Sequence, residues 1–299
     1  MTDIIIHEVG PRDGLQMEKA AVPTETKLRW ILKLIEAGVD IVQVGSFVHP
    51  EKVPQMADTD TLFTRLQSEK KGKTILSGLV LNEKGLERGM RCGVEMFCMG
   101  VSASETHSKK NTGMSTDEAL GRIIAMAKEA LAAGKKVQVS VQSAFGCGFE
   151  GQIPDERVLK IVSAYLEAGL TNISLADTAG HAHPAQVRRL FGAIRALSPA
   201  ARLTCHFHDT YGVGMANIFA AMESGVTSFE TSFAGLGGCP FTKVAAGNVA
   251  TEDLVHALQR QGMRKDINLP ALIEVARDVA THFGREMPGR VYKTGPLPY

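Results

Sequence analysis

Eight short runs rich in β-branched residues alternate with longer helix-like stretches along this 299-residue chain. Strands are predicted at residues 4–9, 39–46, 74–80, 94–101, 136–143, 172–177, 202–208 and 228–234. Strands that alternate with helices run parallel and are joined by right-handed crossovers. Eight such units favour a closed (β/α)8 TIM barrel. An open doubly wound sheet is the rival fold, but no Gly-rich dinucleotide fingerprint follows any predicted strand.

The stretches between the strands carry the start and stop signals of helices. A capping box, Ser115-x-x-Glu118, precedes one stretch and Gly134 ends it. Helices are predicted at residues 25–37, 82–91, 116–133, 154–168, 184–197, 212–224 and 252–261, with an extra C-terminal helix at 269–283. No Pro/Ser-rich linker divides the chain. We therefore expect one catalytic barrel domain over residues 1–299, with a C-terminal extension from about residue 265.

Composition and charge exclude several classes of partner. Lys and Arg total 33 against 32 acidic residues and no window is strongly basic, so nucleic acid is not an expected partner. No apolar stretch reaches the roughly 18–20 residues that span a bilayer, so no membrane association is expected. The five cysteines are irregularly spaced, which is typical of free thiols, and a cytoplasmic location is predicted. The apolar set of the last helix, which includes Leu272 and Val279, suggests a homodimer unless the barrel buries it.

Residues suited to metal chemistry gather at the ends of the predicted strands, which meet at one mouth of a TIM barrel. Arg12 and Asp13 follow the first strand, and His206 and His208 end the seventh. Residues i and i+2 of a strand share a face, so both imidazoles can reach one ion; hydrogen-bonded core histidines are the alternative. With Asn248, these side chains form a mixed N/O set suited to Mg²⁺ or Mn²⁺. Arg12 would stabilise an enolate oxygen.

Several motifs extend this pattern: Val9-Gly-Pro-Arg-Asp-Gly-Leu-Gln16, Ser46-Phe-Val-x-Pro50, His206-x-His-Asp-Thr-Tyr-Gly212, and Ala234-Gly-Leu-Gly-Gly-Cys-Pro240 followed by Gly247-Asn248. From about residue 5 to 265 the chain closely resembles the 3-hydroxy-3-methylglutaryl-CoA lyase family. This family belongs to a wider group of metal-dependent barrels that includes isopropylmalate and homocitrate synthases. The resemblance implies retro-Claisen cleavage of an acyl-CoA thioester to acetyl-CoA and an oxo acid, which is acetoacetate in the parent reaction.

The resemblance also implies a role for individual residues. The metal ligands would be Asp13, His206, His208 and Asn248, holding a divalent ion, Mg²⁺ or Mn²⁺. The catalytic residues would be Arg12 as the enolate stabiliser, Cys239 as a proton-transfer thiol, and Asp177 as a group that assists proton movement. The predicted substrate-binding residues are Gln16, Gln43, Ser46 and Thr178.

Two positions depart from the family pattern. Gln43 replaces a glutamate, which removes a negative charge near Arg12, and Gly45 replaces a bulkier residue, which would enlarge the acyl pocket or loosen the strand end. One hypothesis is therefore a related 3-hydroxy-3-alkylglutaryl-type or citramalyl-type CoA thioester as the substrate.

Other functions remain open from the sequence. They are a condensing synthase or aldolase, a CoA-thioester binding protein with weakened catalysis, and a phosphate-binding barrel isomerase supported only by Gly237-Gly238. A second His-x-His pair, His181 and His183, is expected to form an exposed polar turn.

Overall fold

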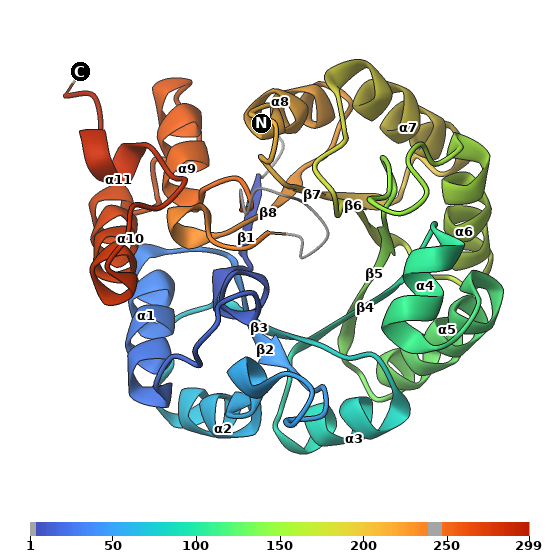
Figure 1. Ribbon diagram of the computed structural model, residues 1–299, viewed down its shortest axis with the longest axis horizontal. Coiled ribbons are helices and arrows are strands. Elements are labelled where there is room, and N and C mark those ends of the chain that lie inside the picture. Colours follow the sequence, from blue (N-terminus) through green and yellow to red (C-terminus); the bar gives the residue numbers. More distant parts are fainter. Residues whose placement is uncertain (1–3, 239–246, 299) are drawn as a thin grey trace.

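Eight parallel strands form a closed barrel in the order β1 to β8, surrounded by an outer ring of helices (Figure 1). The computed structural model describes residues 4–238 and 247–298. The strands are β1 (Ile5–Glu8), β2 (Ile41–Ser46), β3 (Ile75–Leu79), β4 (Met96–Ser102), β5 (Lys136–Gln142), β6 (Asn172–Asp177), β7 (Arg202–Phe207) and β8 (Ser228–Thr231). The predicted TIM barrel is thereby confirmed, and each predicted strand has its counterpart.

The helices are α1 (Thr24–Ala37), α2 (Thr59–Glu69), α3 (Glu83–Arg91), α4 (Glu105–Thr112), α5 (Thr116–Ala132), α6 (Asp155–Glu167), α7 (Pro184–Leu197), α8 (Gly214–Glu223), α9 (Thr251–Arg260), α10 (Leu269–Phe283) and α11 (Val291–Thr294). The capping box at Ser115 is present, with the backbone N–H of Glu118 donating to the serine hydroxyl at 3.2 Å. Helices α2, α4 and α11 were not predicted from the sequence. Three shorter turns complete the chain: η1 (Gly10–Gly14), η2 (Pro54–Met56) and η3 (Phe233–Gly235).

The core consists of an apolar shell outside the barrel and a polar filling within it. Large side chains such as Trp30, Phe97 and Tyr165 are fully buried between strands and helices, where each contributes roughly 1.5–3 kcal/mol of hydrophobic stabilisation. Inside the barrel, the Gln138 amide donates to the Thr204 hydroxyl at 3.1 Å, although β5 and β7 are not neighbours in the sheet. The interior can therefore hold polar chemistry without exposing the apolar shell.

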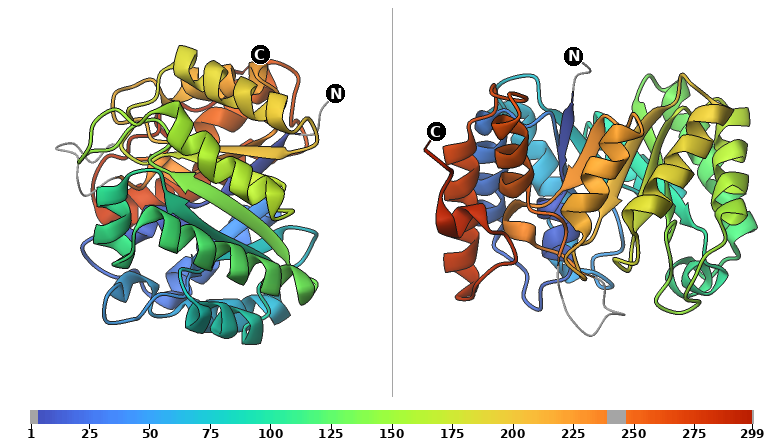
Figure 2. Two further views of the ribbon diagram at one scale, coloured as in Figure 1. Left: turned by 90° about the vertical axis from the view of Figure 1, so that its right-hand side faces the viewer. Right: turned by 90° about the horizontal axis from the view of Figure 1, so that it is seen from above.

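Helix α10 buries its apolar face within the same chain. It lies beside α1 and α9, as Figure 2 shows from two further sides. Leu272 and Val279 are buried there, so the reason given above for a homodimer falls away. In the described part of the chain, no helix combines the length and apolar character needed to cross a membrane.

Candidate active site

A tight turn after β1 presents Arg12 and Asp13 at the mouth of the barrel. The turn, η1, is held by Glu8, whose carboxylate accepts from the backbone N–H of Gly10 at 2.7 Å and from that of Phe233 at 3.0 Å. Gly10 has no space for a side chain, because a Cβ there would lie 2.7 Å from Glu8 Oε1. The buried carboxylate of Glu8, which folds back onto this turn, therefore explains the glycine of the Gly-Pro-Arg-Asp motif.

Asp13, His206 and His208 converge on one point. The Nε2 atoms of the two histidines lie 3.2 Å apart, and each lies within 3.8 Å of Asp13 Oδ2 (3.8 Å from His206 and 3.7 Å from His208). These residues form a group with metal-ligand geometry, since their donor atoms all lie within 4.8 Å of one another. The β7 alternation explains the arrangement, because i and i+2 residues share the inner face.

Asn248 lies beside the same cluster and turns its side-chain amide toward Asp13. An isolated β-bridge pairs it with His208, and its amide nitrogen donates to Asp13 Oδ2 at 2.8 Å and to the Leu236 carbonyl at 2.9 Å. Its Oδ1 is buried and has no partner among the described residues. A buried acceptor without a donor is costly, and a divalent cation would satisfy it. The donor set of one carboxylate, two imidazoles and one amide oxygen fits such an ion.

The charges around this centre keep Asp13 ionised. Burial alone would raise the pKa of Asp13, but the adjacent Arg12 guanidinium and the two histidines hold it well below its usual range. Burial alone would lower the pKa of His206, but its hydrogen bond to Glu230 and the charge of Asp13 raise it. Asp13 is therefore an anion at neutral pH, as a metal ligand must be.

Arg12 is fixed by two contacts that leave other N–H groups free to face a substrate. Its Nε donates to Oε1 of Gln43 and its Nη1 donates to Asp13 at 2.5 Å. Within the described chain, its Nη2 has no hydrogen-bond partner. The guanidinium therefore holds its charge beside the metal-ligand cluster with hydrogen-bond capacity to spare.

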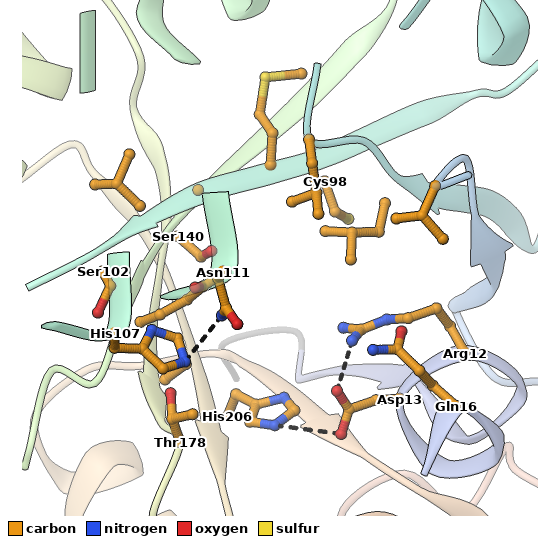
Figure 3. A pocket seen from close by; sticks show the side chains of 18 of the residues that line it. Arg12, Asp13, Gln16, Cys98, Ser102, His107, Asn111, Ser140, Thr178 and His206 are labelled. Carbon is orange, nitrogen blue, oxygen red and sulfur yellow. Dashed lines mark hydrogen bonds and ion pairs between the residues drawn. The ribbon is translucent and has the colours of Figure 1, made fainter. Parts of the chain in front are cut away.

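A cavity of about 450 Å³ opens from this cluster across the mouth toward β3, β4 and β5. This volume lies within the roughly 300–1,000 Å³ typical of small-molecule sites. Figure 3 shows Arg12, Asp13 and His206 on one side of the cavity, facing Asn111 of α4 and Ser140 of β5. The predicted substrate residues that line the cavity are Gln16, Gln43 and Thr178. The Thr178 hydroxyl accepts from Ser143 N–H at 2.9 Å, so its own proton remains available to the cavity.

Two predicted site residues lie behind the cavity wall. Ser46 is fully buried and its carbonyl accepts from Thr59, so its side chain is not among those that line the cavity. The carboxylate of Asp177 is also buried and accepts from the backbone N–H groups of His181 at 2.8 Å and Ala182 at 3.1 Å. These contacts favour a role for Asp177 in holding the loop after β6. Its catalytic role, like substrate contact by Ser46, stays a prediction, and Cys239 lies outside the described residues.

Gly45 faces away from the cavity, which corrects the idea that it enlarges the acyl pocket. A Cβ at this position would lie 2.9 Å from Cγ2 of Thr59 on α2 and closer still to its hydroxyl. The β2–β3 pairing shifts register between Gln43 and Gly45. The glycine therefore allows α2 to approach an irregular strand and does not shape the substrate site.

Glu230 is the functional candidate that the sequence analysis missed. It lies within β8, lines the cavity, and accepts from His206 Nδ1 at 2.9 Å. The sequence did contain an indication, namely an acidic residue within a predicted core strand, because buried charges rarely occur without a partner.

Comparison with known proteins gives a consistent result. The family described as HMGL-like matches residues 3–279 of this chain. The hydroxymethylglutaryl-CoA lyase YngG of Bacillus subtilis is 38% identical over 287 residues, covering 96% of this chain and 95% of the relative. The mitochondrial hydroxymethylglutaryl-CoA lyase of Bos taurus is also 38% identical, over 96% of this chain and 87% of its own length.

Solved structures agree with this similarity. The crystal structure of the HMG-CoA lyase of Bacillus subtilis has a TM-score of 0.94 at 35% identity and covers 98% of both chains. The structure of an HMG-CoA lyase from Acinetobacter baumannii, in complex with coenzyme A and 3-methylmalate, has a TM-score of 0.92 at 36% identity. It covers 99% of this chain and 96% of that one. The likeness thus extends over the whole barrel and the helices that follow it.

Proposed function

This chain belongs to the HMGL-like family, and from that premise we propose that it cleaves 3-hydroxy-3-methylglutaryl-CoA to acetyl-CoA and acetoacetate. The observation that supports this most strongly is the Asp13, His206 and His208 cluster, with Arg12 beside it, at the mouth of a substrate-sized cavity. The relatives carry lyase names, which favours cleavage over condensation, thioester binding alone, or a phosphate-binding isomerase. They also favour the methylglutaryl thioester over the citramalyl-type alternative.

The reaction breaks one carbon–carbon bond and moves two protons. The C3 hydroxyl loses its proton, the C2–C3 bond breaks as a ketone forms at C3, and the electron pair passes to C2 as a thioester enolate. A proton delivered to C2 then gives acetyl-CoA. When bound by Asp13, His206, His208 and Asn248, the divalent ion would polarise the hydroxyl and carbonyl oxygens of the substrate.

The charge that develops on the enolate oxygen is the part of this reaction for which Arg12 is suited. Its guanidinium is always charged, and its contacts to Gln43 and Asp13 hold it in one orientation before substrate binds. A donor fixed in advance is worth more in a water-poor site than a mobile one. The uncharged Gln43 is sufficient for this purpose, because an amide oxygen accepts from the arginine Nε as a carboxylate would.

Proton delivery to C2 is assigned to Cys239 on the basis of its motif, Gly-Leu-Gly-Gly-Cys-Pro. The segment before it enters the mouth, because Gly238 lines the cavity and Leu236 accepts from Asn248. A thiol can act as a general acid and deliver a proton to the enolate carbon after the C2–C3 bond has broken.

The finer assignments form part of the same proposal. The ion is Mg²⁺ or Mn²⁺, since the donor set contains oxygen and imidazole and no described thiolate. The location is the cytoplasm, which fits the free thiols of Cys92, Cys98, Cys147 and Cys205.

A product assay tests the proposal directly. The protein is incubated with 3-hydroxy-3-methylglutaryl-CoA and Mg²⁺ or Mn²⁺, and acetyl-CoA and acetoacetate are quantified. Equal release of both products, abolished by a chelator and strongly reduced by Cys239→Ala, is the expected result. Binding of the thioester without any product would instead indicate a binding protein. Faster reaction of acetyl-CoA with an oxo acid than cleavage would indicate a condensing enzyme.

A further inference from the structure

Strand register places one acidic residue between two histidines inside the barrel. In the pairing of β8 with β7, Glu230 is opposite His206, and in the pairing of β8 with β1 it is opposite His7. Residues opposite one another in a parallel sheet point to the same side, so the three side chains form one inward-facing layer. This layer lies directly beneath the metal-ligand cluster, because His206 belongs to both.

The Glu230 carboxylate determines which nitrogen of His206 is available to a metal. Its Oε2 lies 2.9 Å from His206 Nδ1, and a carboxylate can only accept, so Nδ1 carries the proton. The other nitrogen, Nε2, then presents a lone pair to the point shared with Asp13 and His208. Carboxylates that fix metal-binding histidines in this way typically strengthen metal affinity by about 10–100-fold.

The opposite side of Glu230 provides no competing hydrogen bond. His7 Nδ1 is 3.7 Å from Glu230 Oε1, beyond hydrogen-bond distance, and has no hydrogen-bond partner in the described chain. His7 Nε2 is instead 2.9 Å from the hydroxyl of Ser77, which in turn can donate to the Val42 carbonyl at 3.3 Å. This direction of donation leaves the proton of His7 on Nε2. Glu230 is therefore committed to His206.

Glu230 also contributes negative charge to the cavity wall. Asp13 and Glu230 are the two carboxylates that line the cavity, against the positive charge of Arg12 beside them. Gln43, where the resemblance would place a glutamate, contributes a neutral amide to Arg12. The second negative charge of the cavity wall is therefore that of Glu230 on β8, and its carboxylate also contacts His206.

We propose that Glu230 is the positioning residue of the metal centre, holding His206 in the Nδ1–H form. The inference rests on the proposed metal-dependent function, but it concerns metal binding and can be tested without turnover. It assigns Glu230 no contact with substrate. Its effect on the reaction is exerted through His206.

The test measures Mn²⁺ binding to the metal-free protein by electron paramagnetic resonance, for the wild type, Glu230→Gln, Gln43→Glu and the double variant. The amide introduced by Glu230→Gln can present either its oxygen or its NH2 group to Nδ1, so it no longer fixes the Nδ1–H form, and this variant is expected to raise the Mn²⁺ dissociation constant by about 10–100-fold. The double variant restores the lost charge at a different place and is expected to bind Mn²⁺ as weakly as Glu230→Gln. Glu252→Gln is the matched control, since Glu252 is buried and accepts from Ala234 N–H at 3.1 Å, away from His206. Its Mn²⁺ affinity should equal that of the wild type.

Unchanged Mn²⁺ affinity in Glu230→Gln would overturn the proposal. Full recovery in the double variant would overturn its positioning part, because charge alone would then be sufficient. If thermal melting shows that Glu230→Gln is unfolded, Glu230→Asp provides the test: it keeps the charge but shortens the arm, so weaker Mn²⁺ binding is expected and wild-type affinity would refute the role. Absence of lyase activity in the wild type, with these affinities as expected, would refute the proposed function and leave this inference standing.

Discussion

Glu8 is expected to make the stability of this protein depend on pH. Burial raises the pKa of Glu8 from 4.5 to about 7, even though Thr251, Gly10 and Phe233 all donate to its carboxylate. Between pH 4.5 and about pH 7, the folded protein therefore retains a proton on Glu8 that the unfolded chain has released. The contribution of Glu8 to stability is therefore greatest below pH 4.5 and declines as the pH rises through 7, where the difference between the two pKa values corresponds to roughly 3 kcal/mol.

The substitution Glu8→Gln removes this titration while it keeps the contacts. The amide oxygen can accept from the Gly10 and Phe233 N–H groups, and the amide N–H can donate to Thr251, whose hydroxyl turns to Thr231 at 2.8 Å. Urea unfolding at pH 5 and pH 8 should show the variant gaining roughly 2–3 kcal/mol relative to the wild type over this interval.

The comparison between the two proteins isolates Glu8, because every other titrating group is common to both. A wild type and a Glu8→Gln variant that keep the same stability difference from pH 5 to pH 8 would refute the reasoning.

Three further outcomes follow from the site geometry. Arg12→Lys keeps the charge but cannot span Gln43 and Asp13, so steady-state assays should show kcat lowered about 100–1,000-fold with Mn²⁺ affinity little changed; a normal kcat would contradict this role. Asp13→Asn should abolish Mn²⁺ binding in a titration of the metal-free protein, and retained binding would remove Asp13 from the ligand set. Gly45→Ala should cost about 1–3 kcal/mol of unfolding free energy through its clash with Thr59, without changing KM; an altered KM at normal stability would place Gly45 in the substrate site after all.

The barrel was predictable because its elements are marked by local patterns. Strand and helix periods, caps and glycine stops depend on neighbouring residues, and the parallel order follows from their alternation. Helix α4 escaped prediction because it carries almost no apolar residues. It is stabilised by its Ser104 cap and by Glu150, which accepts from both the Ser104 hydroxyl at 2.9 Å and the Thr106 N–H at 2.6 Å. Glu150 is more than 40 residues away along the chain, so no local pattern reveals the contact.

The convergence of Asp13, His206 and His208 was predictable for a different reason, namely that parallel strand ends meet at one mouth. That rule explains why Asp13 and His206 come together from opposite ends of the sequence. It says nothing about orientation, so it does not distinguish Thr178, which lines the cavity, from Asp177 and Ser46, which are not among the lining residues and whose roles stay predictions. A residue at a strand end can face the mouth or hold the adjacent loop, and only the hydrogen-bond partners distinguish the two.

Glu230 lies one layer of side chains below the strand ends, and the alternation of inward and outward side chains along the strands accounts for its position. Once His206 and His208 are assigned to the inner face of β7, Thr204 must share that face, because it precedes His206 by two residues. The parallel register then pairs Thr204 with Ser228 and His206 with Glu230. An acid beside a metal-binding histidine therefore follows from the sequence only when the register between β7 and β8 is known. Register depends on how two distant strands pack, which explains why the ligands could be predicted and their supporting carboxylate could not.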